Sequence, residues 1–486
     1  MSYKFRDTAA AILFLAVLAV GVVYLALGFY WQDRLADGAG FLSAEKPYEP
    51  GRLGWPVRVD IPRRLPAPGE AADPEALTAA LMALDDQVET ELTDMLDRDK
   101  AFIETYGLVQ KTLGRRVMDD VQPHYTVTRL SDGSLSFLDP DSSYIDTSGY
   151  AQSTARFRDA LEAEYGIPFL FVQVPQKASV YGEGTLAHGL YDYGDSHADT
   201  FLRTLQREEV DYLDLRPVLA ETGRYSELFF RTDHHWTPEA AFLAWQAVAE
   251  RLETGYGFDF DEAATDPAAW DREVLEDVFL GSQGKRVGSL YAGMDDFELW
   301  TPKGETAFEY EVPIMAYDRV GTMEESLLFP ERLKETDPYR ANPYTYYSGG
   351  DYTFARMKNL QNPDGPTIVL LRDSFACPFA PFMAMGCGEL VTIDLRYFRD
   401  DLMTYIKWVE ADMVIALYSP GSLVLPAAFD FFHVPDQTSW PADRRPLTDE
   451  LGLDKPALAI LARRLPVEKA QASPAPAGPR PDPDKR

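Results

Sequence analysis

The longest run of hydrophobic residues lies near the start of the chain, where residues 8–31 read TAAAILFLAVLAVGVVYLALGFYW without a charge. A helix of ~20 such residues is long enough to cross the ~30 Å hydrocarbon layer of a membrane. Lys4 and Arg6 precede the run and aromatic residues end it, which indicates a cytoplasmic N-terminus and an extracytoplasmic chain after Trp31. A cleaved signal peptide is the alternative, but its apolar core usually has only ~7–15 residues. We therefore expect an uncleaved anchor over residues 1–31.

The following residues, 32–115, predict an extracytoplasmic spacer and an amphipathic helix. Residues 44–74 are rich in proline and glycine, which suits an extended linker. Between Pro74 and Arg115, leucine and valine recur at intervals of three and four residues, so one apolar stripe faces a partner surface. A helix packed on its own domain explains this stripe better than a coiled-coil dimer, because the repeat is short and lacks heptads.

From about Leu135 onward, short hydrophobic runs alternate with amphipathic segments, a pattern typical of a parallel sheet covered by helices. The sequence thus predicts an α/β fold with a mainly parallel sheet. The expected strands are LSFLD (135–139), PFLFVQVP (168–175), DYLDLRPVL (211–219), TIVLL (367–371), ELVTIDLRYF (389–398) and DMVIALYSP (412–420). The expected helices are TARFRDALEAEYG (154–166), Pro238 through Arg251, and one beginning near Cys377.

The main domain is expected to span residues 116–465, with one interruption of the pattern. At about 253–347 the chain is acidic, rich in aromatic residues and without clean periodicity. We interpret this stretch as an insertion that forms a lobe beside the carboxyl edge of the sheet, where open α/β sheets bind ligands. The tail at 466–486, PVEKAQASPAPAGPRPDPDKR, has almost nothing to bury and is expected to be disordered.

Composition and charge narrow the classes of function. The apolar fraction of 46% and aromatic fraction of 13% are those of a globular protein. Lys and Arg number 46 against 78 Asp and Glu, so the formal net charge of −32 repels phosphate backbones and excludes nucleic acid as a partner. The two cysteines, Cys377 and Cys387, are too few for a disulfide framework or a cysteine zinc site. One disulfide or two buried thiols both remain open, and no cofactor is expected.

The first candidate for chemistry is the segment FFRTDHHWTPEAAF at 229–242. A threonine and a proline directly after the histidines mark the N-cap and the first position of a helix. In extended backbone, residues two apart point the same way, so we expect Asp233 to face His235 and His234 to point elsewhere. A carboxylate that binds one ring nitrogen leaves the other nitrogen available as a base.

The second candidate is TIVLLRDSFACPF at 367–379, where an apolar strand runs into Ser374 and then a helix. Such a turn holds the serine hydroxyl out at the carboxyl edge of the sheet. The helix N-terminus supplies N–H groups and a positive partial charge for an oxyanion. A lone serine at a strand end is commonly an N-cap, and a lone histidine is commonly structural. In a chain with six histidines, however, an Asp-x-His at a helix start beside this turn favours a Ser374, His235 and Asp233 triad.

Two other interpretations of these residues remain. Asp233, His234 and His235 could be metal ligands, but adjacent histidines on extended backbone diverge and no nearby motif completes a ligand set. No metal is therefore expected. The many aromatic residues also fit a catalytically idle carbohydrate-binding or scaffold subunit.

The segments TDHHWT (232–237), RDSFACPFAPFMA (372–384) and VTIDLRYF (391–398) together resemble the DHHW family and the SGNH-like domain of alginate O-acetyltransferases of the AlgX/AlgJ type. The resemblance covers roughly residues 120–440. It implies a flavodoxin-like, three-layer α/β/α sandwich in which the Asp-x-His block precedes the serine block, as it does here. The order found in ordinary SGNH esterases, with Gly-Asp-Ser near the N-terminus and Asp-x-x-His near the end, is absent.

The resemblance also implies roles for single residues. Asp233 orients the imidazole, His235 is the base and Ser374 is the nucleophile. The segment TYYSGGDYTF before the serine strand resembles the glycine-bearing block of the family. Gly349 and Gly350 in it would let backbone amides approach an oxyanion closely, although a simple turn is an equal alternative.

Arg372 and Arg396 lie next to predicted strand ends that face the same edge of the sheet. Each would bind an acidic sugar or order a loop. For Arg396, a structural ion pair with a neighbour such as Asp394 is the favoured alternative.

These expectations together describe a membrane-anchored serine acyltransferase that O-acetylates a polysaccharide through an acetyl-serine intermediate. A carbohydrate acetylesterase of the same fold is the alternative, as is a non-catalytic subunit. The expected partners are the polysaccharide, the membrane through the N-terminal helix, and a membrane-bound O-acyltransferase as acetyl donor. The expected location is the cell membrane, with a single pass and a catalytic domain in the periplasm or on the cell surface.

Overall fold

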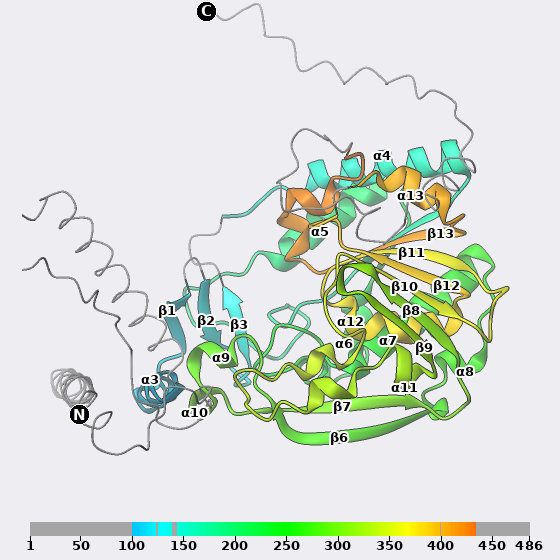
Figure 1. Cartoon of the computed structure of the whole chain (residues 1–486). Helices are drawn as coiled ribbons and strands as arrows, with labels where there is room; N and C mark the ends of the chain where they lie inside the picture. Colours follow the sequence, from blue (N-terminus) through cyan, green and yellow to red (C-terminus); the bar gives the residue numbers. More distant parts are fainter. Residues whose placement is uncertain (1–99, 123–124, 139–142, 399, 434–486) are drawn as a thin grey trace, which may run out of the picture. The chain divides into compact units, whose positions relative to one another are not determined.

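The computed structural model describes residues 100–122, 125–138, 143–398 and 400–433 (Figure 1). Two compact units, Met1–Phe102 and Ile103–Arg486, divide the chain, and nearly all described residues belong to the second. The predicted anchor, most of the predicted spacer and the predicted disordered tail lie outside the described residues. Among the residues that are described, no helix combines the length and the apolar character needed to span a bilayer.

The helices and strands follow the predicted alternation for most of the second unit. The strands are β1 (Val117–Gln122), β2 (Tyr125–Arg129), β3 (Leu135–Leu138), β4 (Phe169–Gln173), β5 (Tyr212–Asp214), β6 (Trp270–Phe279), β7 (Asp295–Pro302), β8 (Phe308–Val312), β9 (Tyr317–Gly321), β10 (Phe354–Asn359), β11 (Thr367–Arg372), β12 (Glu389–Ile393) and β13 (Met413–Tyr418). The α-helices are α3 (Lys100–Thr112), α4 (Ser148–Tyr165), α5 (Gly194–Arg207), α6 (Leu215–Ala220), α7 (Pro238–Tyr256), α8 (Glu262–Thr265), α9 (Gly284–Val287), α10 (Ser289–Ala292), α11 (Met323–Ser326), α12 (Ala376–Gly386) and α13 (Leu402–Trp408).

An eight-stranded sheet forms the centre of the unit, with the order β5-β4-β13-β11-β12-β10-β8-β9. The strands from β5 to β12 in this order run parallel, and the alternation of strands and helices predicted this part. The strands β10, β8 and β9 are antiparallel to their neighbours. The sheet is therefore mixed, and the prediction of a mainly parallel sheet is correct only for the half that carries the crossover helices.

Two hydrophobic cores cover the two faces of the sheet, as a three-layer sandwich requires. Successive strand residues point to opposite faces, so Ile368 and Leu370 of β11 belong to one core while Val369 and Leu371 belong to the other. Helices α6, α7 and α12 pack on the first face, and α4, α5 and α13 on the second (Figure 1). Because β11 and β13 are buried on both faces, their sequences are continuous hydrophobic runs.

The segment predicted as an insertion, 253–347, is only in part a lobe beside the sheet. Strands β8 and β9 lie within it and extend the central sheet through β10. Strand β8 has alternating buried and half-buried residues, the pattern of a strand with one covered face. The long hairpin β6–β7 forms a separate two-stranded sheet. The interpretation of 253–347 as an insertion that forms a lobe beside the sheet therefore does not hold for β8 and β9, which belong to the sheet itself.

Two of the predicted strands are shorter than their hydrophobic runs. In DYLDLRPVL only Tyr212–Asp214 is strand, because the Asp214 side chain accepts a hydrogen bond from the N–H of Arg216 and caps helix α6. In ELVTIDLRYF the strand ends at Ile393, and the buried Asp394 begins a turn. Helix α7 begins as predicted, with Thr237 as its N-cap and Pro238 at its first position.

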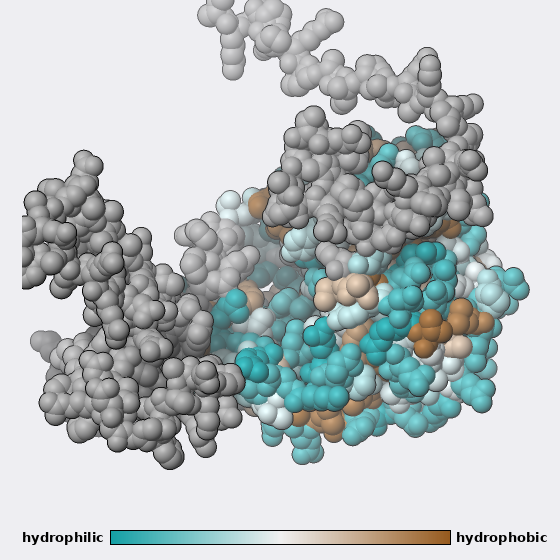
Figure 2. All heavy atoms as spheres, viewed as in Figure 1, coloured by the Kyte–Doolittle hydropathy of each residue, from teal (hydrophilic) through white to brown (hydrophobic). Residues whose placement is uncertain are grey.

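The visible face of the described unit is largely hydrophilic, with small scattered hydrophobic patches (Figure 2). This surface agrees with the large negative net charge of the chain. The two most exposed large hydrophobic residues of the described part, Val180 and Tyr191, lie in loops, whereas Val320 is exposed on strand β9.

Both cysteines are unpaired and buried, Cys377 on helix α12 and Cys387 directly after it. Burial raises the pKa of the Cys377 thiol to about 11, and buried neutral thiols react slowly. We therefore expect the folded protein to release almost no thionitrobenzoate from Ellman's reagent, and the unfolded protein to titrate two thiols per chain. Rapid labelling of the folded protein would contradict the packing of α12.

Candidate active site

The segment that contains the two histidines is a tight loop rather than extended backbone. An isolated bridge between Phe229 and Trp236 closes the loop, and the N–H of Phe230 donates to the carbonyl of His235 across 3.2 Å. Residues 231–235 between these contacts form a series of bends. The loop enters helix α7, so its geometry is fixed at both ends.

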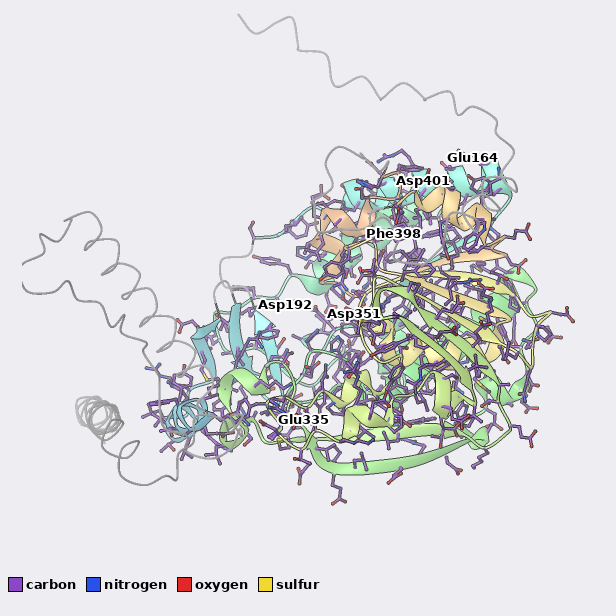
Figure 3. All side chains as sticks on the ribbon, in the orientation of Figure 1. Glu164, Asp192, Glu335, Asp351, Phe398 and Asp401 are labelled. Carbon is purple, nitrogen blue, oxygen red and sulfur yellow. The ribbon has the colours of Figure 1, made fainter. Side chains whose placement is uncertain are left out.

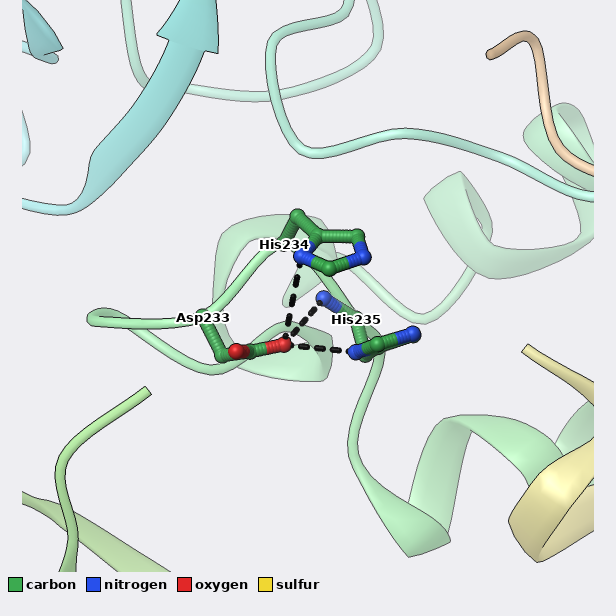
Figure 4. A group of neighbouring side chains, drawn as sticks. All are labelled: Asp233, His234 and His235. Carbon is green, nitrogen blue, oxygen red and sulfur yellow. Dashed lines mark hydrogen bonds and ion pairs between the residues drawn. The ribbon is translucent and has the colours of Figure 1, made fainter. Parts of the chain in front are cut away.

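Asp233, His235 and Ser374 form a continuous line of hydrogen bonds. The Nδ1 atom of His235 lies 2.6 Å from Oδ1 of Asp233, and its Nε2 atom lies 2.7 Å from Oγ of Ser374. The backbone N–H of His235 donates to the same Oδ1 across 3.0 Å (Figure 4). The sequence predicted that these three residues come together, and the structure brings them into contact.

The hydrogen-bond partners determine which nitrogen of His235 carries the proton. An ionised carboxylate can only accept, so the proton lies on Nδ1, which donates to Asp233. The lone pair of Nε2 then accepts the hydroxyl proton of Ser374. This is the tautomer that a general base requires, because the unprotonated nitrogen faces the nucleophile.

The carboxylate of Asp233 is ionised although it is buried. Burial alone would raise the pKa of Asp233, but His234, His235 and the hydrogen bonds from His235 and the Ser282 N–H outweigh it. The pKa of Asp233 therefore lies well below its ordinary value. Desolvation, followed by the neighbouring His235, lowers the pKa of His234.

The expectation that His234 points away from Asp233 was wrong. Its Nδ1 atom lies 3.6 Å from the same Oδ1 of Asp233, and the two imidazole rings are only 3.8 Å apart between centroids (Figure 4). The cause is the bent backbone, since residues two apart share a direction only in extended chain. His234 also lies 3.0 Å from Oγ of Ser282, and its side chain is 43% exposed.

A buried aspartate holds the turn that presents Ser374. Oδ1 of Asp373 accepts the N–H of Phe375, and Oδ2 accepts the N–H and hydroxyl of Ser419 and the hydroxyl of Ser422, all within 3.1 Å. Asp373 is only 1% exposed. It therefore joins the end of β11 to the segment after β13, on the edge where the parallel strands end.

Two aromatic residues join the serine segment to the histidine loop. The indole N–H of Trp236 donates to the carbonyl of Phe375 across 2.8 Å. The ring of Tyr344 stacks on His235 with 4.2 Å between centroids, and its hydroxyl donates to the carbonyl of Ser374 across 3.1 Å. No sequence pattern indicated Tyr344, because it lies in a 3-10 turn (Pro343–Tyr346) of the aperiodic segment.

The aperiodic segment also supplies a direct contact with the triad. The backbone N–H of Ser282 donates to Oδ2 of Asp233 across 2.6 Å. Gly281 lies so close that a Cβ atom there would fall 2.2 Å from Cβ of Asp233. Only glycine allows this approach. The Gly-Ser pair one residue after the end of strand β6 was the available signal, and the sequence patterns did not single it out.

Gly349 and Gly350 lie in a loop that packs against helix α12. The hydroxyl of Ser348 donates to the carbonyl of Cys377, and Gly349 has φ 74°, a left-handed conformation that favours glycine. The carbonyl of Gly349 accepts the Tyr352 hydroxyl across 2.7 Å. The structure confirms a turn here, and the role of the two glycines as oxyanion donors stays a prediction.

The two arginines at this edge both bind carboxylates of the protein. Arg396 makes a two-point ion pair with Asp394, with contacts of 2.9 and 2.6 Å, so the predicted structural pair is present. Arg372 is buried, forms an ion pair with Asp351 and donates to the carbonyl of Tyr352 across 2.6 Å. Asp351, which is labelled in Figure 3, also lies 3.4 Å from Arg396. The arginines thus order the glycine loop, and their predicted contact with an acidic sugar remains untested.

His234 and His235 do not diverge as expected, so their remaining contacts decide between a metal site and a triad. Ligand atoms of Asp233, His234 and His235 lie within 4.8 Å of one another. However, both ring nitrogens of His235 are already hydrogen-bonded, to a carboxylate and to a serine hydroxyl. That arrangement favours a triad over a ligand set, which requires a free lone pair on each residue.

A cavity of about 720 Å³ lies next to the histidine loop, but the triad does not line it. Six of its lining residues are acidic: Asp132, Glu227, Asp277, Asp295, Asp296 and Glu298. The cavity is thus separate from the Ser374 hydroxyl.

Comparison with known proteins agrees with the motifs. The family described as "SGNH hydrolase-like domain, acetyltransferase AlgX" matches residues 137–271, which include Asp233 and His235 but end before Ser374. This match confirms the resemblance that the sequence motifs indicated. No curated protein is significantly similar in sequence to the chain.

Several solved structures are similar in fold. A DHHW family protein from Eubacterium siraeum is 19% identical, with a TM-score of 0.50 over 66% of this chain and 99% of that one. Bacillus cereus PatB1 with a sulfonyl adduct is 19% identical, with a TM-score of 0.51 over 64% of this chain and 100% of that one. The O-acetyltransferase domain of Pseudomonas putida AlgJ is 16% identical, with a TM-score of 0.38 over 70% of this chain and 99% of that one. The first two support an SGNH-like α/β fold.

The bonds of Asp373 predict a large loss of stability on its removal. Asp373→Ala leaves four buried donors without their acceptor, so we expect the free energy of unfolding in urea to fall by about 3 to 5 kcal/mol. Asp373→Asn keeps one acceptor oxygen and should lose less. A loss below ~0.5 kcal/mol for the alanine variant would show that Asp373 does not hold the turn.

Proposed function

We propose that this chain is a serine O-acyltransferase that transfers acetyl groups to hydroxyls of a polysaccharide. The observation that carries the proposal is the unbroken line from the Asp233 carboxylate through both nitrogens of His235 to Oγ of Ser374. A structural histidine needs no such alignment, and a serine that only capped helix α12 would bind a backbone N–H instead. The serine makes no such cap bond in the structure.

The family match supports transfer to an acceptor other than water. The matching family is named for an acetyltransferase, and the match covers the segment that carries the proposed orienting residue and base. The motif RDSFACPFAPFMA, which resembles the same family, supplies the nucleophile. An SGNH-like fold alone supports both hydrolysis and transfer.

The first half of the reaction forms an acetyl-serine. Oγ of Ser374 attacks the carbonyl carbon of an acetyl donor while Nε2 of His235 accepts the hydroxyl proton. The tetrahedral intermediate then expels the donor's leaving group, which takes that proton from His235. Asp233 keeps the imidazolium oriented and stabilises its charge throughout.

The second half transfers the acetyl group. A sugar hydroxyl gives its proton to Nε2 of His235 and attacks the acetyl-serine carbonyl. Collapse of the second tetrahedral intermediate releases the O-acetylated sugar and returns the proton to Oγ of Ser374. If water takes the place of the sugar, the same steps give an acetylesterase, which is the alternative function.

The N–H of Ser374 is a ready oxyanion donor. It makes no hydrogen bond with any other described residue, and it lies at the start of the turn into helix α12. The positive end of that helix adds to its effect. Gly349 or Gly350 is proposed as the second donor.

The proposed position of the protein in the cell rests on the sequence alone. The uncharged run at 8–31 supports a single membrane anchor with the catalytic unit outside the cytoplasm. A membrane-bound O-acyltransferase that delivers acetyl groups across the membrane is the proposed donor partner. The polysaccharide itself is the proposed acceptor.

Replacement of the nucleophile tests the proposal most directly. We expect Ser374→Ala to lower turnover of a chromogenic acetyl ester by about four to six orders of magnitude, because triad members act as a unit. The wild-type protein should gain one acetyl group on the Ser374 peptide in mass spectrometry, and the variant none. Ser153→Ala, on helix α4, removes a hydroxyl bound to the Phe429 carbonyl and serves as the matched control.

Two outcomes separate the competing functions. Parental turnover by folded Ser374→Ala would refute the triad. An acetyl-enzyme that decays at the same rate with and without oligosaccharide would identify an esterase instead.

The two histidines should differ sharply in their effect. His235→Ala removes the base, so its turnover should fall about as far as that of Ser374→Ala. His234→Ala removes a contact with Ser282 worth ~1 kcal/mol, so it should keep at least about a tenth of the parental kcat. Equal losses in two variants with parental melting temperatures would contradict the assignment of His235.

A further inference from the structure

Lys177 is a buried lysine that lies beneath the histidine loop and that the reaction steps above do not use. It follows strand β4 and is 4% exposed. Its Nζ atom donates to three backbone carbonyls, those of Leu135 (2.6 Å), Asp233 (2.5 Å) and Arg231 (3.3 Å). Within the described part of the chain Lys177 forms no ion pair at contact distance, so these carbonyls are its direct partners.

The three contacts match the chemistry of an ammonium group. A protonated lysine has three N–H donors and no acceptor, so each donor has one carbonyl to bind. The carbonyls come from strand β3 and from both ends of the segment 231–233. One side chain therefore joins three parts of the fold at the point where the chain turns into Asp233.

The backbone of the same segment is held from its other side by Asp295 of β7. The carboxylate of Asp295 accepts the N–H of Arg231 (2.6 Å), the N–H of Thr232 (2.8 Å) and the Thr232 hydroxyl (2.5 Å). Lys177 thus binds the carbonyls and Asp295 binds the N–H groups of adjacent peptide units. The peptide planes that set the direction of the Asp233 side chain have little freedom to rotate.

We propose that Lys177 is a positioning residue of the triad: its ammonium group holds the carbonyl of Asp233 and so keeps the Asp233 carboxylate aligned with His235. The inference rests on the proposed function of Ser374, His235 and Asp233. It concerns the alignment of the base and not the chemistry of the nucleophile.

The surroundings of Lys177 lower its pKa, so the side chain loses its charge at a lower pH than an exposed lysine does. Burial lowers the pKa of Lys177 to about 8, against the opposing effect of the carboxylates Asp295, Asp233 and Asp132 and with a smaller contribution from Arg231. Loss of the proton leaves two N–H donors and a lone pair among three carbonyl oxygens. One of the three carbonyl oxygens then faces the nitrogen lone pair instead of an N–H group, so Lys177 forms one hydrogen bond fewer with the loop or strand β3.

Activity and stability should respond to this titration in opposite directions. Since the pKa of Lys177 is lower in the folded chain than in the unfolded chain, the unfolded chain binds more protons above about pH 8. The contribution of Lys177 to the free energy of unfolding therefore increases with pH above that value. A loss of turnover at alkaline pH without a loss of stability is the signature of a positioning role.

The experiment measures kcat and the melting temperature of the wild type, Lys177→Arg and Lys177→Met between pH 6 and pH 10, with a chromogenic acetyl ester. We expect wild-type kcat to decrease as the pH rises through about 8, while the melting temperature does not decrease. This decrease in kcat is the alkaline limb of the pH profile. Arginine stays charged, so Lys177→Arg should move that limb beyond pH 10. Lys177→Met should lower kcat at pH 7 at least tenfold, with KM little changed, and remove the limb.

Two control variants separate positioning from general destabilisation. Lys303→Met removes another lysine that donates to a backbone carbonyl, that of Ala268, and should keep the wild-type profile. Leu161→Ala opens a cavity under helix α4 and should lower the melting temperature without moving the alkaline limb.

Either of two results would overturn the inference. The first is a wild-type kcat that stays constant to pH 10, a result that does not depend on whether any variant folds. The second is an unchanged limb in Lys177→Arg. If Ser374→Ala abolishes turnover while these profiles stay flat, the proposed function stands and the role of Lys177 fails. If Ser374→Ala keeps parental turnover, the proposed function fails first.

Discussion

The site depends on one constraint, which is that the buried carboxylate of Asp233 must receive hydrogen bonds from every side. A carboxylate without water is costly to keep ionised unless N–H groups surround it. Here two donors come from His235 and one from Ser282. The backbone has to bend between Asp233 and His235 so that both the N–H and the ring of His235 reach the Asp233 carboxylate. To supply the third, a separate segment has to approach closely enough that only glycine fits at position 281.

The same constraint explains why the long segment after helix α7 belongs to the catalytic unit. Its β6–β7 region provides Ser282 and Asp295, its 3-10 turn provides Tyr344, and its strands β8 and β9 extend the central sheet. The segment therefore contributes both direct contacts to the site and two strands to the sheet. Lys177 approaches the loop from the segment after β4, so the central sheet and the separate β6–β7 hairpin both contribute to the position of one carboxylate.

The sequence predicted the parts of this design that depend on local pattern. The continuous hydrophobic runs gave β11 and β13, the Thr-Pro pair gave the start of α7, and the motifs gave Asp233, His235 and Ser374. The antiparallel strands, Ser282, Tyr344 and Lys177 could not be found in this way, because their roles arise from contacts between distant segments. The direction of His234 was wrong for a related reason. The rule that residues two apart point the same way applies only to extended chain. This loop is bent, and in the bent loop the N–H of His235 donates to the Asp233 carboxylate.

The base and the nucleophile are separated by 139 positions along the chain. Contacts between such distant residues form late, because the loop between them must be closed before they gain stability. Strand β11 also lies in the middle of the sheet, between β13 and β12, which come after it in the chain. A chain that has emerged from a ribosome or a translocation channel only as far as Ser374 thus lacks the neighbours that hold its nucleophile. The proposed triad can therefore assemble only when synthesis and folding are nearly complete, so the proposed activity is absent from an unfinished chain.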